Sequence, residues 1–543
     1  MYQGEAKGGL LMGRGLRLRR AVRLVACAAA IVVVAPPALA STHSPGPPGT
    51  PSWTVYHDDP AGRGDAAGVG SVDTAARAWT SPTLNGQLYG EPLALGNRVY
   101  VATENDTVYA LSAATGAIAW STQLGTTVPS STHLLCSNIL PNVGITGTPV
   151  IDPARHEIFV VADELKNGKP AHMLTGLNTA TGQVELSQDV DPPGQPPANL
   201  LQRTGLTLDD GHVIFGFGGN AELCGFYRGR LVSVPESGGT PRFFTAAVEP
   251  GDDRGAIWMG GAAPAVGPNG DLWVATGPGT EYSAKRPYDY SDAVLEISPS
   301  MRVVQFFAPA EWAVNDSDDL DMTIEPVLLP DGQVVLTGKN TIVYLLNGRH
   351  LGGIGHQQAQ LGPVCTTNID GGSANVGMTV YLPCEGSVLA VKAVSSPPAL
   401  HLLWNSGAGG GPPIVAGGLV WTIGQNGRLY GLDPVNGKIR QQAVIGVPAN
   451  HFPTPGIGVG LMLAPSAQNV IAFRTSAASA GRGAGATSSA TRDNRHSTSS
   501  GPANTSPGPA AGGRMIAEVV FVCLVAVGAF GWFIWLIRRQ RRT

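Results

Sequence analysis

The chain has 543 residues, of which only 14% are charged, while 73 are glycine and 43 are proline. Average soluble proteins carry about 25% charged residues and about 12% glycine plus proline, so this composition excludes a coiled coil, a helical bundle and a collagen. The formal net charge is −4, and the terminal segments carry a net positive charge, which leaves the middle of the chain strongly acidic. An acidic surface repels phosphate backbones, so we expect no nucleic-acid partner.

The first 40 residues have the pattern of an export signal. A basic stretch ends at Arg23, an apolar run follows over residues 24–35, and a small-x-small cleavage pattern ends at Ala40. We therefore expect residues 1–40 to be a signal peptide and residues 41–52 to be a short spacer. Residues 53–475 then form the folded part.

The folded part contains one repeated pattern. In its clearest copy, short strands alternate with turns at Gly96 and at Thr115-Gly116, and the last strand ends in Trp120. Such units repeat about every 40 to 60 residues, and four strands in a unit of this length indicate a β-propeller. The copies begin near Glu91, Gly147, Gly205, Ala262, Glu325, Gly371, Gly411 and Phe452.

The last copy lacks a fourth strand. Residues 78–84 resemble residues 119–124, the fourth strand of the first copy, and can complete the last copy from the N-terminal side. Closing the ring in this way removes exposed sheet edges. The sequence therefore predicts an all-β, eight-bladed β-propeller, with seven blades as the alternative if one weak copy is not a blade.

The pattern Tyr-x-Leu-x-x-x-Thr-Gly-x-x-x-Trp over residues 109–120 resembles the tryptophan-docking repeats of the pyrroloquinoline-quinone (PQQ) family. That family includes quinoprotein alcohol dehydrogenases and the propeller lipoprotein of the outer-membrane β-barrel assembly machine. Residues 53–58 also look like the family's opening segment. The resemblance implies the propeller fold for residues 53 to about 473, and it makes PQQ with calcium a candidate cofactor.

The enzymes of that family hold their quinone between a tryptophan and a disulfide of adjacent cysteines, and bind calcium beside a catalytic aspartate. This chain has no adjacent cysteine pair and no Cys-x-x-Cys-His haem motif. We therefore predict no cofactor and no catalytic residue. A quinoprotein-like oxidoreductase with PQQ and calcium in the axial funnel is the alternative.

Four of the six cysteines lie in the expected ectodomain, which an export signal would place in an oxidising compartment. Four cysteines can pair in three ways. We prefer Cys365 with Cys384 around one blade junction, and Cys136 with Cys224 between early loops.

The densest acidic cluster consists of Asp316, Asp318, Asp319 and Asp321. Calcium takes six to eight oxygen ligands, so four carboxylates at this spacing are a candidate metal site. The glycine and the distal glutamate of an EF-hand loop are missing. The alternative interpretation is a solvated loop.

In a propeller, the residues just before the first strand of every blade gather at one mouth of the central channel. These positions predict an axial funnel that binds a small polar ligand or a cation. Alternatively, the same groups satisfy one another and ordered water. The predicted funnel residues are Glu91, Gln202, Arg203, Trp258, Glu325, Asp370, Asn450 and His451.

The C-terminal part has a membrane-anchoring pattern. Residues 476–514 are rich in Ala, Gly, Ser, Thr, Pro and Arg and predict a disordered stalk. Residues 515–537 are long and apolar enough for one transmembrane helix. The arginine-rich residues 538–543 predict a cytoplasmic tail, which places the N-terminal ectodomain outside the cell membrane.

The sequence as a whole predicts a single-pass membrane protein with an extracellular propeller. We expect a binding or scaffolding module of the bacterial cell envelope, without catalytic activity. The expected partners are the membrane, through the C-terminal helix, and an envelope protein, a glycan or a small ligand.

Overall fold

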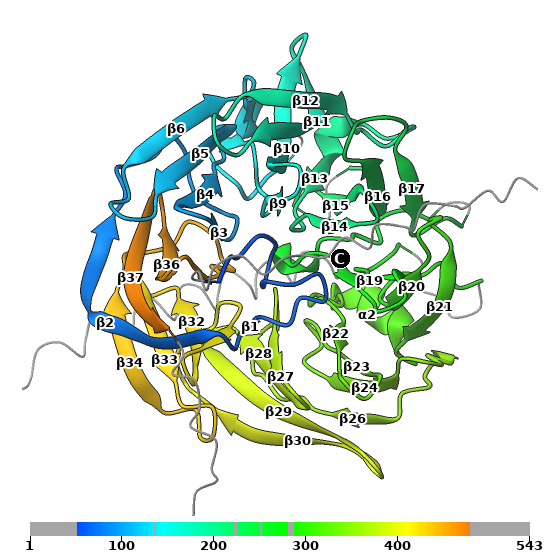
Figure 1. The fold of residues 1–543 in the computed structure, drawn as a ribbon. Helices are drawn as coiled ribbons and strands as arrows, with labels where there is room; N and C mark the ends of the chain where they lie inside the picture. The colour runs from blue at the N-terminus through cyan, green and yellow to red at the C-terminus, as the bar shows by residue number, and fades with distance from the viewer. Residues whose placement is uncertain (1–50, 135, 222–224, 250–251, 281–286, 478–543) are drawn as a thin grey trace, which may run out of the picture. The chain divides into compact units, whose positions relative to one another are not determined.

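The computed structural model describes residues 51–134, 136–221, 225–249, 252–280 and 287–477. These residues form eight sheets arranged in a ring around a central axis (Figure 1). We number the sheets as blades 1 to 8 in the chain order of their innermost strands. The prediction of an eight-bladed propeller is confirmed, and the seven-bladed alternative is wrong.

The first four blades follow one another along the chain, and apart from the added strand β25 the neighbouring strands within each blade are antiparallel. Blade 1 consists of β3 (Leu93–Leu95), β4 (Arg98–Ala102), β5 (Thr107–Ser112) and β6 (Ile118–Gln123). Blade 2 consists of β9 (Val150–Asp152), β10 (Glu157–Lys166), β11 (Lys169–Asn178) and β12 (Val184–Asp189). Blade 3 consists of β13 (Leu200–Gln202), β14 (Thr207–Asp209), β15 (His212–Gly219), β16 (Arg230–Pro235) and β17 (Arg242–Thr245). Blade 4 consists of β18 (Ala265–Val266), β19 (Leu272–Ala275), β20 (Val294–Ile297) and β21 (Val303–Ala308), with β25 (Gly353–Ile354) parallel to β21.

The remaining blades complete the ring. Blade 5 consists of β22 (Val327–Leu328), β23 (Gln333–Leu336), β24 (Val343–Asn347) and β26 (Ala359–Leu361). Blade 6 consists of β27 (Ala374–Val376), β28 (Thr379–Cys384), β29 (Ser387–Ser395) and β30 (Pro398–Asn405). Blade 7 consists of β31 (Ile414–Ala416), β32 (Leu419–Gly424), β33 (Arg428–Leu432) and β34 (Ile439–Val444), with β1 (Asp65–Ala66) parallel to β31. Blade 8 consists of β35 (Gly456–Gly458), β36 (Leu461–Ser466), β37 (Asn469–Ala477) and β2 (Val69–Thr80).

Short elements connect the blades. They are the two-stranded sheet of β7 (Val128–Pro129) and β8 (Asn142–Val143), the helices α1 (Ser130–His133) and α2 (Trp312–Asp318), and the 3₁₀ turns Pro197–Asn199 and Met259–Gly261.

The position of a strand within its blade explains its residue pattern. The third strand β5 is buried along nearly its whole length, because neighbouring blades pack on both of its faces. The outermost strand β6 alternates between exposed and half-buried residues, because only one of its faces packs on another blade. The core therefore lies between the blades.

Strand β2 closes the ring, as the sequence predicts, but it covers residues 69–80 instead of the predicted 78–84. It is the outermost strand of blade 8 and pairs antiparallel with β37, with Trp79 opposite Ala472 and Thr80 opposite Ile471. The other three strands of blade 8 come from the end of the folded part. The N-terminal strand β2 and the last strand β37 thus share one sheet.

The Thr-Gly and Trp positions of the repeat connect neighbouring blades. The indole of Trp79 lies on Gly116 of blade 1, where a Cβ atom would come within 2.5 Å of the ring. Its Nε1 donates to Ala113 O at 2.8 Å. Gly116 also has a φ of +73°, so glycine suits this position both sterically and conformationally. The same arrangement recurs between Trp120 and Gly182 and between Trp404 and Gly437.

Residues 53–64, which we call the central segment, cross the middle of the ring (Figure 1). Their backbone bonds to five of the eight blades, so at this level the centre of the ring is filled by the chain itself. The bonds join Trp53 with Ala94, Thr54 O with Ile151 N, Pro60 O with Val266 N, Arg63 O with Asn375 N, and Gly64 O with Val415 N.

The predicted disulfide Cys365–Cys384 is confirmed, with a Cα–Cα distance of 5.9 Å. Cys224 lies outside the described residues, so its pairing with Cys136 stays a prediction. The predicted signal peptide, the predicted transmembrane helix over residues 515–537 and residues 478–514 of the predicted stalk also lie outside them. Ser476 and Ala477, which were predicted to begin the stalk, belong to strand β37. Among the described residues, no helix is long and apolar enough to span a membrane.

Candidate functional site

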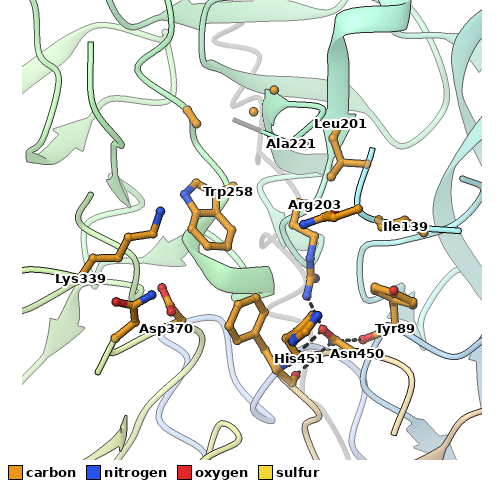
Figure 2. A pocket seen from close by; sticks show the side chains of 16 residues that line it. Tyr89, Ile139, Leu201, Arg203, Ala221, Trp258, Lys339, Asp370, Asn450 and His451 are labelled. Carbon is orange, nitrogen blue, oxygen red and sulfur yellow. Dashed lines mark hydrogen bonds between the residues drawn. The ribbon is translucent and has the colours of Figure 1, made fainter. Parts of the chain in front are cut away.

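A cavity of about 400 Å³, which we call the mouth pocket, opens at one end of the inner strands (Figure 2). Five predicted funnel residues line it, because each precedes or begins the inner part of a blade. These five residues are Arg203, Trp258, Asp370, Asn450 and His451.

The other three predicted funnel residues do not line the mouth pocket. Glu91 accepts hydrogen bonds from Trp53 Nε1 at 2.8 Å and from His57 N at 2.9 Å, so it holds the central segment. Burial raises the pKa of Glu91 well above its usual value.

The side chains of Glu325 and Gln202 likewise form hydrogen bonds within the protein interior. Glu325 Oε1 accepts from the backbone N and the hydroxyl of Ser373, at 2.9 and 3.1 Å. Burial raises the pKa of Glu325 to about 8. Gln202 Nε2 donates to Thr204 O at 2.7 Å. The prediction placed these side chains at the right end of their strands, but they point toward the protein interior.

The mouth pocket also has lining residues that were not predicted, among them Tyr89, Phe452 and Lys339. Tyr89 lies two residues before Glu91 and Phe452 directly follows His451, whereas Lys339 follows β23, the second strand of blade 5. The second strand runs antiparallel to the first, so its end lies at the same mouth as the start of the first. Lys339 could therefore have been predicted as a lining residue from its position in the turn after a second strand.

Arg203 is the buried cation of the mouth pocket, with only 7% of its surface exposed. Its Nη2 donates to Asn450 Oδ1 at 3.0 Å, and its guanidinium carbon lies 5.7 Å from the centre of the Phe452 ring and 6.0 Å from that of Tyr89. Within the described part of the chain, the guanidinium makes no other hydrogen bond and no ion pair. Burial lowers the pKa of Arg203.

Lys339, by contrast, has its charge compensated. Its Nζ lies 2.9 Å from Asp321 Oδ1 and 3.3 Å from Asp319 Oδ2. Trp258 Nε1 donates to Asp321 Oδ2 at 2.7 Å, and the ring lies 5.5 Å from Lys339 Nζ. Figure 2 shows Trp258 with Lys339 on one side and Arg203 on the other.

The four aspartates of the predicted metal site are dispersed. Asp316, on α2, accepts from Gly279 N and from the Ser291 hydroxyl, both at 3.0 Å. Burial raises the pKa of Asp316 to about 8.

The chain turns at Asp319, whose φ is +60°, directly after α2. Asp318 is exposed, while Asp319 and Asp321 face Lys339. Because the chain turns at the end of α2, the side chains of Asp316 and Asp321 point in different directions. Across the described residues, no group of three or more His, Cys, Asp or Glu side chains is placed to hold a metal ion.

The fold and the mouth pocket define an eight-bladed propeller with a polar and aromatic cavity on its axis. Residues 65–242 match the family model described as outer membrane protein assembly factor BamB. No curated protein matches the chain. The matched segment, about a third of the chain, is similar to the PQQ-repeat family, and the described residues have a propeller fold.

Solved structures with the same fold include redox enzymes. The quinohemoprotein alcohol dehydrogenase from Comamonas testosteroni has a TM-score of 0.60 at 14% identity, over 78% of this chain and 80% of that chain. The quinohemoprotein alcohol dehydrogenase from Pseudomonas putida HK5 has a TM-score of 0.57 at 12% identity, over 82% of each chain. A europium-containing methanol dehydrogenase has a TM-score of 0.54 at 15% identity, over 73% of this chain and 86% of that chain. Likeness at these identities concerns the fold alone.

Proposed function

We propose that this chain is a non-catalytic binding and scaffolding module of the bacterial cell envelope, whose mouth pocket binds an organic anion. A C-terminal membrane helix would hold the propeller outside the cell. The single observation that carries the binding role is Arg203, a buried cation with one hydrogen bond and no ion pair among the described residues.

A buried charge with one hydrogen bond and no ion pair is unfavourable, and the more distant Glu104 carboxylate only partly offsets the desolvation of Arg203. A ligand carboxylate at Arg203 would supply that partner, and the planar guanidinium can bind it with two parallel hydrogen bonds. Trp258 and Phe452 lie beside this position, with ring centres 5.9 Å apart. Such rings favour a ligand with a planar or apolar part.

The pocket wall is held in place before any ligand binds. Asn450 Nδ2 donates to Tyr89 O at 2.8 Å, which joins the loops of blades 8 and 1. Gln425 Nε2 donates to Asn450 O at 2.9 Å and to His451 O at 2.8 Å. Because the wall is already ordered, less conformational entropy is lost when a ligand binds.

The alternative proposal is a membrane-tethered quinoprotein-like oxidoreductase, which the fold shared with quinohemoprotein alcohol dehydrogenases favours. Arg203 and Trp258 suit the carboxylates and the flat rings of PQQ. The described residues do not fit the calcium ion that this proposal needs, because they contain no group of three or more His, Cys, Asp or Glu side chains placed to hold a metal ion. We therefore derive no redox step here.

A thermal-shift experiment on the full-length chain in detergent separates the two proposals. Its arms are PQQ, Ca²⁺, and both together. A ligand at 100 times its dissociation constant stabilises the folded state by about 2.7 kcal/mol. Stabilisation by PQQ alone supports an anion site, whereas a shift that needs both, with dye-linked alcohol oxidation, supports the enzyme. Ca²⁺ acting alone would indicate a metal site separate from the mouth pocket.

Replacing Arg203 by Met is expected to weaken PQQ binding about 10- to 150-fold, the usual loss for a hydrogen bond to a charged group. Without ligand, the melting temperature should stay the same or rise, since the variant removes a desolvated charge that no ion pair compensates. Isothermal titration and thermal unfolding measure the two effects.

The matched control is Arg474→Met, which removes an exposed arginine of blade 8 and should leave PQQ affinity unchanged. Equal PQQ affinity in the wild-type protein and Arg203→Met would contradict the proposed anion site.

A further inference from the structure

A second cavity of about 630 Å³, which we call the side pocket, adjoins the mouth pocket. The two cavities share Asn368, Asp370, His451 and Phe452. The rest of the side pocket comes from the turns of blades 6 and 7. A ligand seated at Arg203 can therefore extend into a second preformed space.

The disulfide holds one wall of the side pocket. Cys365 and Cys384 each lie next to residues of this wall, and Glu385 N donates to Asn368 O at 3.1 Å. Thr367 Oγ1 donates to Glu385 O at 3.3 Å. These links fix the carboxylates of Asp370 and Glu385 on adjacent loops of one wall.

The side pocket has the opposite charge to the Arg203 end of the mouth pocket. Its described lining residues include Asp370 and Glu385 but neither lysine nor arginine. Asp370 Oδ1 is buried and accepts no hydrogen bond from the described residues. The nearby Lys339 is paired with Asp319 and Asp321, and its charge also partly opposes the effect of burial on the pKa of Asp370. Burial raises the pKa of Asp370 to about 7, and a ligand cation would favour its ionised form.

The pocket walls between Arg203 and the two carboxylates can form hydrogen bonds with peptide groups. The Asn368 side chain lines both cavities, and its amide offers a donor and an acceptor, as a peptide group does. Gly407, Gly409 and Gly410 form another part of the side-pocket wall, and none of them has a side chain of its own to cover its backbone groups.

We propose that the ligand is a short peptide whose C-terminal carboxylate binds Arg203 and whose basic group lies against Asp370 and Glu385. This inference rests on the proposed anion site and adds the ligand class. The mouth pocket holds the C-terminal residue beside Trp258 and Phe452, and the side pocket holds the cationic end.

The experiment uses isothermal titration of the full-length chain in detergent with four probes. Lys-Gly-Phe carries both charges, and acetyl-norleucyl-Gly-Phe keeps the carboxylate but lacks the cations. Lys-Gly-Phe amide lacks the carboxylate, and acetyl-phenylalanine reaches the mouth pocket alone. We expect Lys-Gly-Phe to bind about tenfold more tightly than either altered tripeptide, in line with the loss of one charged hydrogen bond.

Two variants test the side pocket independently. Asp370→Asn with Glu385→Gln should remove the preference for the cationic peptide while the preference for the free carboxylate remains. Gly407→Asn should weaken Lys-Gly-Phe but not acetyl-phenylalanine. A Cβ at Gly407 meets no atom within 4 Å, and asparagine tolerates its φ of +63°. Glu185→Gln, on an exposed part of blade 2, is the control and should change no affinity.

The outcomes separate the two proposals. If the acid and the amide bind equally, or no probe binds, the anion site itself fails and the peptide proposal fails with it. If the carboxylate matters but acetyl-norleucyl-Gly-Phe binds as tightly as Lys-Gly-Phe, only the peptide proposal is overturned. A cation preference that survives in the Asp370→Asn, Glu385→Gln variant overturns it as well.

Discussion

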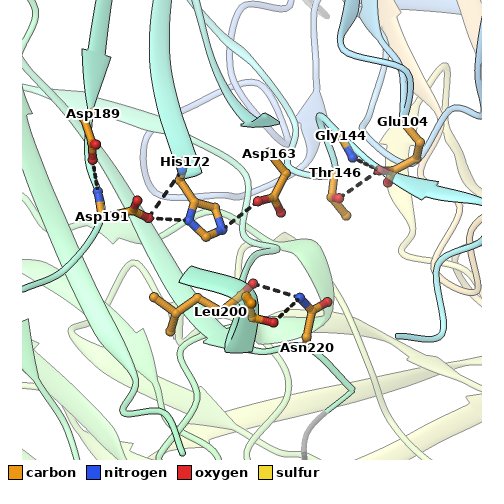
Figure 3. A network of polar contacts seen from close by, with 10 residues as sticks. Glu104, Gly144, Thr146, Asp163, His172, Asp189, Asp191, Leu200 and Asn220 are labelled. Atoms are coloured by element: carbon orange, nitrogen blue, oxygen red, sulfur yellow. Dashed lines mark hydrogen bonds and ion pairs between the residues drawn. The ribbon is translucent and has the colours of Figure 1, made fainter. Parts of the chain in front are cut away.

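Replacing His172 by Gln is expected to lower the free energy of unfolding by about 3–5 kcal/mol at pH 6, the usual cost of breaking a buried ion pair. His172 lies on β11 and is fully buried. Its Nδ1 is 2.6 Å from Asp191 Oδ1, and its Nε2 is 3.1 Å from Asp163 Oδ1 (Figure 3). Without the imidazolium, the buried Asp163 carboxylate would lose its counter-charge.

The loss should depend on pH. Burial alone would lower the pKa of His172, but Asp163 and Asp191 outweigh it and raise the pKa to about 10. The pKa of an unfolded histidine is about 6.5. The stabilisation by His172 is therefore complete below about pH 6.5 and is lost as the pH rises through about 10. Denaturant unfolding at pH 6 and pH 9.5 measures this difference.

The control for this prediction is His401→Gln, because His401 is exposed on β30 and should contribute little at any pH. Adding Asp163→Asn and Asp191→Asn to His172→Gln should restore part of the stability, since no buried charge then remains uncompensated. A loss of less than 1 kcal/mol at pH 6, or an equal loss at both pH values, would contradict the role given to this ion triad.

Replacing Trp79 by Ala should also lower the free energy of unfolding by about 3–5 kcal/mol, as large-to-small changes of a buried aromatic residue do. Trp79 is 7% exposed, and its indole covers Gly116 across the junction where the ring closes. This junction connects the N-terminal strand β2 to blade 1. We expect β2 to separate from blade 8 more readily in the variant. Denaturant unfolding and limited proteolysis within residues 69–80 measure the two effects.

Two comparison variants distinguish the closure from general packing. Trp79→Phe keeps an aromatic ring but loses the hydrogen bond to Ala113 O, and should cost less than Trp79→Ala. Trp120→Ala removes the same contact between blades 1 and 2, and should destabilise the protein without promoting cleavage in β2. If Trp120→Ala and Trp79→Ala give the same cleavage pattern, the prediction that Trp79 specifically holds β2 on blade 8 is wrong.

The architecture could be predicted from the sequence because its determinants are local and repeated. A Thr-Gly turn followed by a tryptophan specifies a turn, a strand and a contact with the next blade, and Trp79 and Trp120 follow the same rule. The Cys365–Cys384 disulfide could be predicted from the sequence for a similar reason, because both cysteines belong to one blade junction.

Only part of the candidate site could be predicted from the sequence. The strand order places Arg203, Asp370 and His451 at one mouth, and the structure brings them together there. Strand order does not decide whether a loop side chain points outward or inward. Glu91 points inward because the central segment offers it the Trp53 indole and the His57 backbone N–H.

The sequence by itself determined the propeller fold, the closing strand and the end of the ring at which polar loop residues gather, since all three follow from repeat spacing and strand alternation. The structure decided between eight blades and seven. Only the tertiary structure decided which of these residues share a cavity, how α2 disperses the Asp316–Asp321 cluster, and that His172 lies between two carboxylates. Such contacts join residues whose side-chain directions depend on how whole blades pack against one another and against the central segment, and no local pattern encodes that packing.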